Sequence, residues 1–224
     1  MFDTLKLSEL SANNAGILRG PSSTRPTIWI VEENGIRAVV KDFSTNKFLF
    51  RNTVGRFLVW REGKAYKKLR GIRGVPVLYR VVDGLALVIE EIQGRDLENL
   101  ENEIKLSSPF FDALEELVRR FHRRGLAHCD LKRAPNTLIG SDGFPYIVDW
   151  AASISKEEFR LPLLGSIYRR FLSDDYLAVI KLKLRHAPET VRPDEKDRYH
   201  YQSGGEKFIR AVRDRLRAIL QKAV

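Results

Sequence analysis

Apolar residues in the first half of the chain occur in short runs separated by turn signals. Residues 26–43, PTIWIVEENGIRAVVKDF, carry two apolar runs on either side of an Asn-Gly pair at 34–35. Residues 75–92, VPVLYRVVDGLALVIEEI, repeat this arrangement around an Asp-Gly pair at 83–84. Such pairs adopt the left-handed backbone conformations that tight hairpin turns require. The pattern therefore predicts two β-hairpins.

A helical period appears between the two hairpins. Residues 54–74 predict a helix that stops at Gly71, because glycine commonly follows the last turn of a helix. The apolar stripe expected on this helix consists of Phe57, Leu58, Trp60, Ala65 and Leu69. The order predicted for the first half of the chain is strand, strand, helix, strand, strand.

A second amphipathic helix is predicted at residues 107–125. Pro109 suits its first turn, and Gly125 suits its end. Short strands follow near 137–139 and 146–149, separated by the turn sequence GSDGFP. From about residue 155 onward the pattern is mostly helical.

Two helices are predicted in this last part. Residues 173–186 are expected to form the first, and Pro188 stops it. Residues 204–224 form an amphipathic helix with a basic polar face. That helix suits packing on the rest of the protein or contact with an anionic membrane surface, and the pattern leaves both open.

The order of these elements predicts an α+β protein with two lobes and a cleft between them. Residues 1–92 are expected to form the first lobe, an antiparallel sheet with one helix. Residues 93–224 are expected to form a minimal, mostly helical second lobe. With 224 residues, 43% of them hydrophobic, the chain is long enough and apolar enough to fold in this way.

Charge and cysteine content bear on the binding partner and the cellular compartment. The formal net charge is +10, which suits an anionic partner but does not choose among nucleotide, nucleic acid and phosphorylated lipid. A single cysteine, Cys129, excludes an intramolecular disulfide and fits a reducing compartment. No signal peptide and no membrane-spanning run are expected, so we predict a cytoplasmic protein, with peripheral contact at the inner membrane left open.

Five polar residues follow one another along the chain in an order that suits phosphoryl transfer. They are Lys41, Glu62, Asp130, Asn136 and Asp149. Phosphoryl transfer needs a cation on the phosphates, oxygen ligands for Mg²⁺, and a carboxylate near the acceptor hydroxyl. Each residue alone has an ordinary structural explanation, because Asp and Asn are common in loops and Lys at strand ends. Together they predict a site in the cleft.

This order resembles the protein-kinase-like superfamily, over residues 15–155, and most of all the small bacterial RIO-like and lipopolysaccharide (Kdo) kinases. The resemblance implies that Lys41 binds ATP and that Glu62 is its ion-pair partner. It implies that Asp130 is the catalytic aspartate and that Lys132 lies near the transferred phosphoryl group. It further implies that Asn136 and Asp149 bind Mg²⁺.

The same resemblance places the adenine against residues 89–92, the sequence IEEI. Glu90 and Ile92 would contact it through backbone atoms. The chain contains no G-x-G-x-x-G motif, so residues 15–27, which include Arg25, are the candidate phosphate-binding region.

The chain departs from the family pattern at two further positions. Asn136 follows Asp130 by six residues, where the family has five. The family's Asp-Phe-Gly appears as Asp149-Trp150-Ala151, which keeps an apolar residue but loses the flexible glycine. A flipping switch of the kind found in regulated kinases is therefore not expected.

The histidine and cysteine before Asp130 suggest a different chemistry, which we considered. His128 and Cys129 are adjacent, and neighbouring residues on an extended segment point to opposite faces. That geometry is poor for a Cys-His nucleophile, so His128 is expected to have a structural role.

The sequence therefore predicts an ATP- and Mg²⁺-dependent kinase. Its acceptor would be a hydroxyl, on a Ser or Thr of a protein or on a lipopolysaccharide core sugar. A nucleotide-binding pseudokinase or scaffold is the alternative. A basic nucleic-acid-binding module is a third class, but no motif of that class is present and no nucleic acid is expected as a partner.

Overall fold

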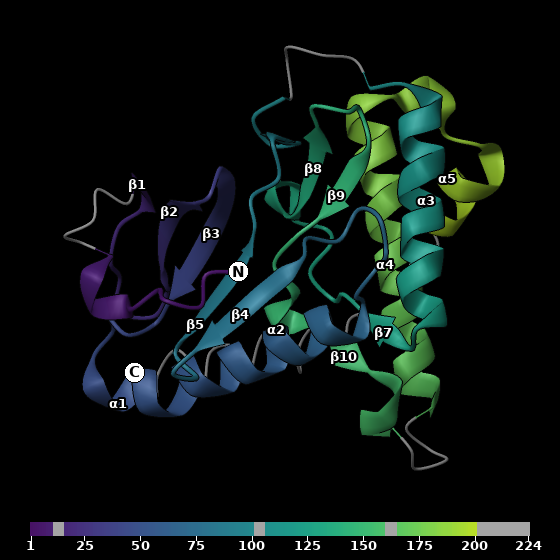
Figure 1. Cartoon of the computed structure of the whole chain (residues 1–224). Helices are drawn as coiled ribbons and strands as arrows, with labels where there is room; N and C mark the ends of the chain where they lie inside the picture. The colour runs from purple at the N-terminus through teal and green to yellow at the C-terminus, as the bar shows by residue number, and fades with distance from the viewer. Residues whose placement is uncertain (11–15, 101–105, 160–164, 201–224) are drawn as a thin grey trace.

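The computed structural model describes residues 1–10, 16–100, 106–159 and 165–200, and shows an α+β protein (Figure 1). Its main sheet is antiparallel and has the strand order β1-β2-β3-β5-β4. These strands are β1 (Gly16–Arg19), β2 (Thr27–Glu33), β3 (Ile36–Asp42), β4 (Leu78–Val82) and β5 (Ala86–Glu90). Two smaller antiparallel sheets pair β10 (Ile154–Ser155) with β7 (Leu126–Ala127), and β6 (Gly94–Asp96) with β8 (Thr137–Gly140) and β9 (Pro145–Ile147).

Both predicted hairpins are confirmed. β2 and β3 are joined at Asn34 and Gly35, whose φ angles are +53° and +75°. β4 and β5 are joined around Asp83 and Gly84, with φ angles of +53° and +65°. Two successive left-handed residues match the twist of the flanking strands, so these dipeptides fix the register of both hairpins.

The helix predicted at 54–74 begins earlier and ends earlier than expected. Helical backbone starts with α1 (Phe48–Phe50), passes through a π turn at Arg51–Gly55, and continues as α2 (Arg56–Lys68). Gly71 lies three residues beyond the end of α2 and has a φ of +82°. The predicted stop is therefore near the observed one, but the start was missed because residues 48–53 show no clear apolar period.

The apolar stripe predicted on this helix was wrong at two positions. Phe57 and Trp60 are 52% and 59% exposed. The buried face of α2 instead includes Glu62, which forms an ion pair with Lys41 on β3. A stripe chosen by hydrophobicity alone misses this face, because the face must present a carboxylate to the sheet. Its remaining members are Val59, Gly63, Ala65 and Tyr66.

Three further helices pack beside one another in Figure 1: α3 (Ser108–Arg123), α4 (Gly165–His186) and α5 (Pro193–His200). The helix predicted at 107–125 corresponds to α3, and its last turn is followed by Gly125 at φ +70°. The helix predicted at 173–186 is the second part of α4, which begins eight residues earlier. Lys183 on α4 is buried and pairs with Glu115 on α3 and Glu195 on α5. The helix predicted at 204–224 lies outside the described residues.

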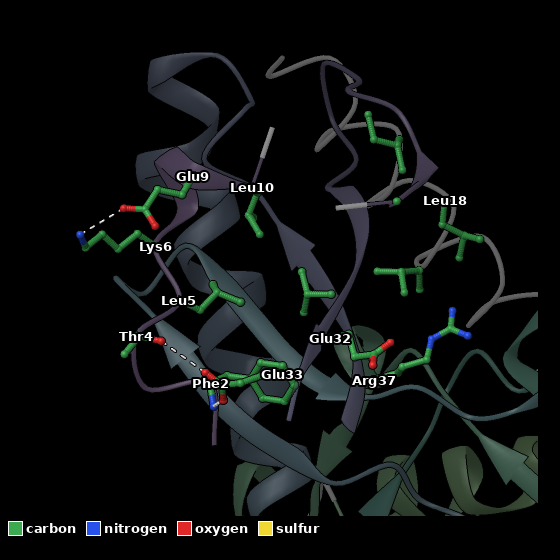
Figure 2. Close-up of a pocket in the computed structure, with 14 residues that line it drawn as sticks. Phe2, Thr4, Leu5, Lys6, Glu9, Leu10, Leu18, Glu32, Glu33 and Arg37 are labelled. Carbon is green, nitrogen blue, oxygen red and sulfur yellow. Dashed lines mark hydrogen bonds and ion pairs between the residues drawn. The ribbon is translucent and has the colours of Figure 1, made fainter. Parts of the chain in front are cut away.

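The first ten residues cover one face of the main sheet, which the sequence pattern did not predict. Phe2 and Leu10 are buried in a cluster with Trp29, Ala38 and other apolar residues of the sheet. Figure 2 shows this N-terminal segment, in which Thr4 donates a hydrogen bond to Glu33. The opposite face of the sheet contributes to a second core, which continues through α2 and α3 to α4. Among the described helices, none has the length and apolar composition that crossing a bilayer requires.

Candidate active site

Lys41 lies at the centre of a cluster of charged side chains from three separate segments. Its Nζ donates to Glu62 Oε1 at 2.6 Å and to Asp149 Oδ1 at 2.9 Å. The side chains of Lys41 and Glu62 are 13% and 3% exposed, whereas that of Asp149 is 43% exposed. The ion pair expected between Lys41 and Glu62 is thus present, and Asp149 forms the more accessible side of the cluster.

The pKa values of the three groups follow from this contact. Burial acts to lower the pKa of Lys41, but the adjacent Asp149 and Glu62 carboxylates overcome it and raise the pKa. The Lys41 charge lowers the pKa of Asp149 to about 2. Burial raises the pKa of Glu62 despite the contact with Lys41. At neutral pH the cluster therefore holds a fixed ammonium and an ionised, accessible Asp149 carboxylate.

The sequence suggested that Asp149 ends a strand, but the structure shows that it does not. β9 ends at Ile147, and Asp149 has a left-handed backbone with a φ of +64°. Trp150 then begins a short 3-10 turn and is completely buried. Its ring packs edge-on against Phe121 and His128, with centroid distances of 5.1 and 4.7 Å. The predicted apolar residue after the aspartate thus anchors this turn in the core.

His128 joins the loop that carries Asp130 to the segment that leads to Asp149. The Asp130 amide donates to His128 Nδ1 at 3.3 Å, and His128 Nε2 donates to the Val148 carbonyl at 3.0 Å. The ring is fully buried, which agrees with the structural role predicted for it. One imidazole ring thereby links two segments of the predicted site.

Asn136 lies against Asp130 despite the extra residue between them. Its Nδ2 donates to the Asp130 carbonyl at 2.9 Å, and Asn136 is 5% exposed. A 3-10 turn at Ala134–Asn136 takes up the additional residue. The amide of Val148 donates to the Asn136 carbonyl at 3.0 Å, which attaches this turn to the segment before Asp149.

Asp175 on α4 supports the same loop and was missed in the sequence. Its carboxylate accepts from the backbone amides of His128 at 2.8 Å and Cys129 at 3.0 Å. It also contacts His122 Nε2 at 3.0 Å, and Asp175 is 1% exposed. Cys129 has a φ of +66°, a conformation that non-glycine residues rarely adopt, so the loop needs such support. The signal in the sequence is an acid at helical spacing from the buried residues of α4, among them Ala178, Val179 and Leu182.

Cys129 is not arranged as a nucleophile. Burial, and after it the neighbouring Asp175, raises the pKa of its thiol well above the ordinary value. Its Sγ is directed to the Ala127 carbonyl at 3.7 Å. A reactive cysteine needs the opposite environment, one that lowers the thiol pKa.

Arginines surround the accessible side of the cluster, and the sequence analysis named only one of them. Arg133 lies 3.4 Å from the Asp130 carboxylate. Burial lowers the pKa of Arg19, the nearby Arg25 and Arg133 lower it further, and Asp149 opposes them. These three guanidinium groups are therefore within electrostatic range of one another or of the predicted site. The missed signal was a second arginine in the candidate region 15–27.

The remaining predicted residues are Glu90, Ile92 and Lys132. Glu90 is at the end of β5, where its amide donates to the Val77 carbonyl at 2.8 Å, and Ile92 follows the strand. Lys132 is exposed on the Asp130 loop. A cavity of about 690 Å³ between the N-terminal segment and β1–β3 is lined by Gly16, Ile17 and Leu18 of the candidate region 15–27, but by none of the predicted catalytic, metal-binding or adenine-binding residues (Figure 2). Within the described ranges, no three His, Cys, Asp or Glu side chains converge as a metal cage.

The chemistry available to this arrangement is that of a site for phosphate groups. A buried ammonium and nearby guanidinium groups attract phosphate oxygens. The Asp149 carboxylate and the Asn136 amide are oxygen donors of the kind that Mg²⁺ prefers, and two protein ligands suffice for an ion that keeps several waters and substrate phosphates. The residues present therefore fit a Mg²⁺–nucleotide complex.

Comparison with known proteins gives a partial similarity. No protein-family model matches the chain. A stretch of 74 residues, 33% of the chain, is 36% identical to the serine/threonine-protein kinase PknD of Chlamydia trachomatis serovar L2b (strain UCH-1/proctitis). The PknD of serovar L2 (strain ATCC VR-902B / DSM 19102 / 434/Bu) matches to the same extent. The match spans 8% of the length of each of these proteins, so the chain is similar to a serine/threonine kinase over a limited segment.

Proposed function

We propose that the protein is an ATP- and Mg²⁺-dependent phosphotransferase that moves the γ-phosphate of ATP to a hydroxyl group. The observation that carries this proposal is the contact of Lys41 with both Glu62 and Asp149, at 2.6 and 2.9 Å. The local similarity to a serine/threonine kinase supports the same reaction class.

Lys41 and the arginines are proposed to bind the nucleotide phosphates. Glu62 holds the ammonium in place, so that it meets the phosphate oxygens without reorganising. Arg19 ends β1 and Arg25 lies in the segment between β1 and β2. These arginines would take the part that glycine-rich loops play with backbone amides. Bound Mg²⁺ would neutralise charge on the phosphates, with Asp149 and Asn136 as its protein ligands.

Asp130 is proposed as the catalytic aspartate. Its carboxylate orients the acceptor hydroxyl and receives its proton as the oxygen attacks the γ-phosphorus. Asn136 and His128 fix the backbone of Asp130 from either side. Arg133 lies 3.4 Å from the Asp130 carboxylate, and Lys132 is proposed to lie near the transferred phosphoryl group.

The division into two lobes follows from this assignment. Residues 1–92 would form the nucleotide-binding lobe, which ends just after β5, and residues 93–224 would form the lobe that carries Asp130 and Asp149. Adenine would bind between them, against the carbonyl of Glu90 and the amide of Ile92. The Glu90 amide already donates to the Val77 carbonyl, so the proposed contact with adenine uses the Glu90 carbonyl.

The acceptor is proposed to be a Ser or Thr side chain of a protein. The similarity to a serine/threonine kinase favours this class over a lipopolysaccharide core sugar. A lipopolysaccharide core sugar is the competing acceptor, because the sequence also resembles the lipopolysaccharide (Kdo) kinases. Both acceptors present a primary or secondary hydroxyl, so Asp130 would act in the same way on either.

Transfer from γ-labelled ATP tests this function. Wild-type protein is offered Mg²⁺ and labelled ATP with two acceptors in parallel, a mixture of Ser/Thr-containing proteins and lipopolysaccharide core. We expect label on the protein acceptor, and none in a reaction with Asp149→Ala. Label on the lipopolysaccharide core alone would show that the acceptor is a sugar hydroxyl and not a Ser or Thr side chain. If ATP raises the melting temperature but no label is transferred to any acceptor or to water, the protein is a pseudokinase and the proposal fails.

A further inference from the structure

We propose that the outer face of α1 and α2 binds the surface of an anionic lipid membrane. This outer face is defined by four exposed apolar residues: Phe48, Leu49, Phe57 and Trp60. The inference goes beyond the proposed phosphotransfer and does not depend on it, since none of these residues belongs to the candidate active site.

The four residues form one stripe rather than scattered exposures. They are 73%, 72%, 52% and 59% exposed, in the order given above. Leu49 and Phe57 are about two turns apart on a nearly continuous helix, and Phe57 and Trp60 about one turn apart. These spacings place the three residues along one side of the helix, and Phe48 is adjacent to Leu49. The rings of Phe57 and Trp60 lie 5.9 Å apart. Figure 1 shows that α1 and the start of α2 run along an edge of the protein, away from α3 and α5.

Cations accompany the aromatic rings of this face. Arg51 lies 5.4 Å from the ring centre of Phe48, and Lys64 lies 5.4 Å from that of Trp60. Arg61 lies 5.9 Å from the ring centre of Phe57. Aromatic rings with lysine and arginine beside them are the combination that lies at the boundary between lipid headgroups and acyl chains.

The charge of this segment is strongly one-sided. Residues 47–70 contain eight lysines and arginines and a single acid, Glu62. Glu62 is buried against Lys41 and does not reach the outer face. Arg61 and Lys68 pair with Glu158 and Glu157, which lie outside this segment. The six further cations leave the exposed surface of α1 and α2 positively charged around an apolar stripe, which complements anionic headgroups and attracts them at a distance.

Charge also argues against two other occupants of the face. A second copy of the protein would bring an identical basic surface against this one, because a two-fold interface pairs the same patch on both subunits. The C-terminal residues 201–224 contain six lysines and arginines and only two acids, so their charge also opposes this contact. A membrane with acidic lipids offers anionic headgroups to the cations of this face and an apolar interior to its exposed apolar residues.

Tryptophan fluorescence provides a direct probe of the face. The chain has three tryptophans, and Trp29 and Trp150 are 7% and 0% exposed, so Trp60 alone can enter a lipid interface. The 224-residue protein is titrated with vesicles of equimolar phosphatidylcholine and phosphatidylglycerol. We expect the emission to shift to shorter wavelength, and the shift to be absent with pure phosphatidylcholine and in Trp60→Phe.

Vesicle sedimentation tests which residues carry the binding. Phe48→Ser with Leu49→Ser, and separately Lys64→Gln with Lys67→Gln, should each weaken binding by roughly tenfold or more. Matched controls are Ile17→Ser with Leu18→Ser, an equally exposed apolar pair on β1, and Lys181→Gln with Lys196→Gln on α4 and α5; these should bind as wild type.

Three results would overturn the proposal. The first is that wild-type protein does not sediment with anionic vesicles. The second is that it sediments but all four double variants bind equally, which would assign the binding to another part of the chain. The third is that Phe48→Ser with Leu49→Ser abolishes self-association in analytical ultracentrifugation and leaves lipid binding intact, which would assign the face to a second copy.

Discussion

Replacing Asp130 with asparagine is expected to lower the rate of phosphoryl transfer by about a thousandfold, the middle of the range for loss of a positioned general base. The substitution keeps the shape of the side chain and an oxygen that can accept from Arg133. It removes the negative charge that receives the proton of the acceptor hydroxyl. The backbone contacts of Asp130 with His128 and Asn136 do not involve the carboxylate charge, so the loop should keep its fold.

The measurement is the initial rate of labelled transfer at saturating ATP, with nucleotide affinity measured in parallel. Asp112→Asn is the matched control, because Asp112 is an exposed acid on α3 away from the cluster, and its variant should transfer at the wild-type rate. ATP affinity of Asp130→Asn should stay within about twofold of wild type. A variant that retains most of its rate would show that Asp130 is not the catalytic aspartate.

Replacing Asp175 with alanine is expected to lower the free energy of unfolding by about 3–5 kcal/mol, as for loss of one member of a buried charged network. Asp175 is 1% exposed and accepts from the amides of His128 and Cys129. Without the carboxylate, these two donors would be buried without an acceptor. The left-handed backbone of Cys129 would also lose the contact that holds it.

Urea unfolding followed by circular dichroism measures this effect. The neighbouring residue supplies the control: Asp174 is 40% exposed and pairs with Arg170 at 3.4 Å, so Asp174→Ala should cost less than about 1 kcal/mol. Asp175→Asn keeps an acceptor oxygen, so its loss in free energy of unfolding should fall between those of Asp174→Ala and Asp175→Ala. This variant can still be measured if Asp175→Ala does not fold. Equal losses for Asp174→Ala and Asp175→Ala would refute the supporting role of Asp175.

Local chemistry explains which parts of the fold could be predicted from the sequence. Both hairpins were predicted because Asn-Gly and Asp-Gly pairs determine a turn without help from distant residues. The contact of Lys41 with Glu62 could also be anticipated, because a cation at a strand end and an acid on the next helix are brought together by a short connection. These features depend on residues that are close along the chain.

The parts that were missed depend on contacts across the fold. Asp175 lies 47 residues after His128, whose amide it accepts, and nothing near it in sequence indicates that partner. The role proposed for Arg19 depends on the charges of Asp149 and Arg133, which the fold brings within electrostatic range of it. The inward face of α2 was misplaced at Phe57 and Trp60, because an ion pair and not hydrophobicity defines it.

One misplaced residue is informative about mechanism. Asp149 was expected at the end of a strand, but it lies two residues beyond β9 in a left-handed conformation. The buried Trp150 and the contact with Lys41 hold it there from opposite sides. Strain of this kind commonly occurs where a side chain must be positioned for function, which agrees with the metal-binding role proposed for Asp149.

Calorimetric titration of ATP in the presence of Mg²⁺ tests the central claim, that the cluster around Lys41 is a nucleotide-phosphate site. The account predicts that wild-type protein binds ATP and that Lys41→Met binds it about 10- to 100-fold more weakly, the loss of one charge-assisted contact. Lys196→Met, an exposed lysine on α5, should bind as wild type, and the melting temperature of each variant verifies that it is folded. A wild-type protein that binds no ATP, or a folded Lys41→Met that binds it equally well, would contradict the account.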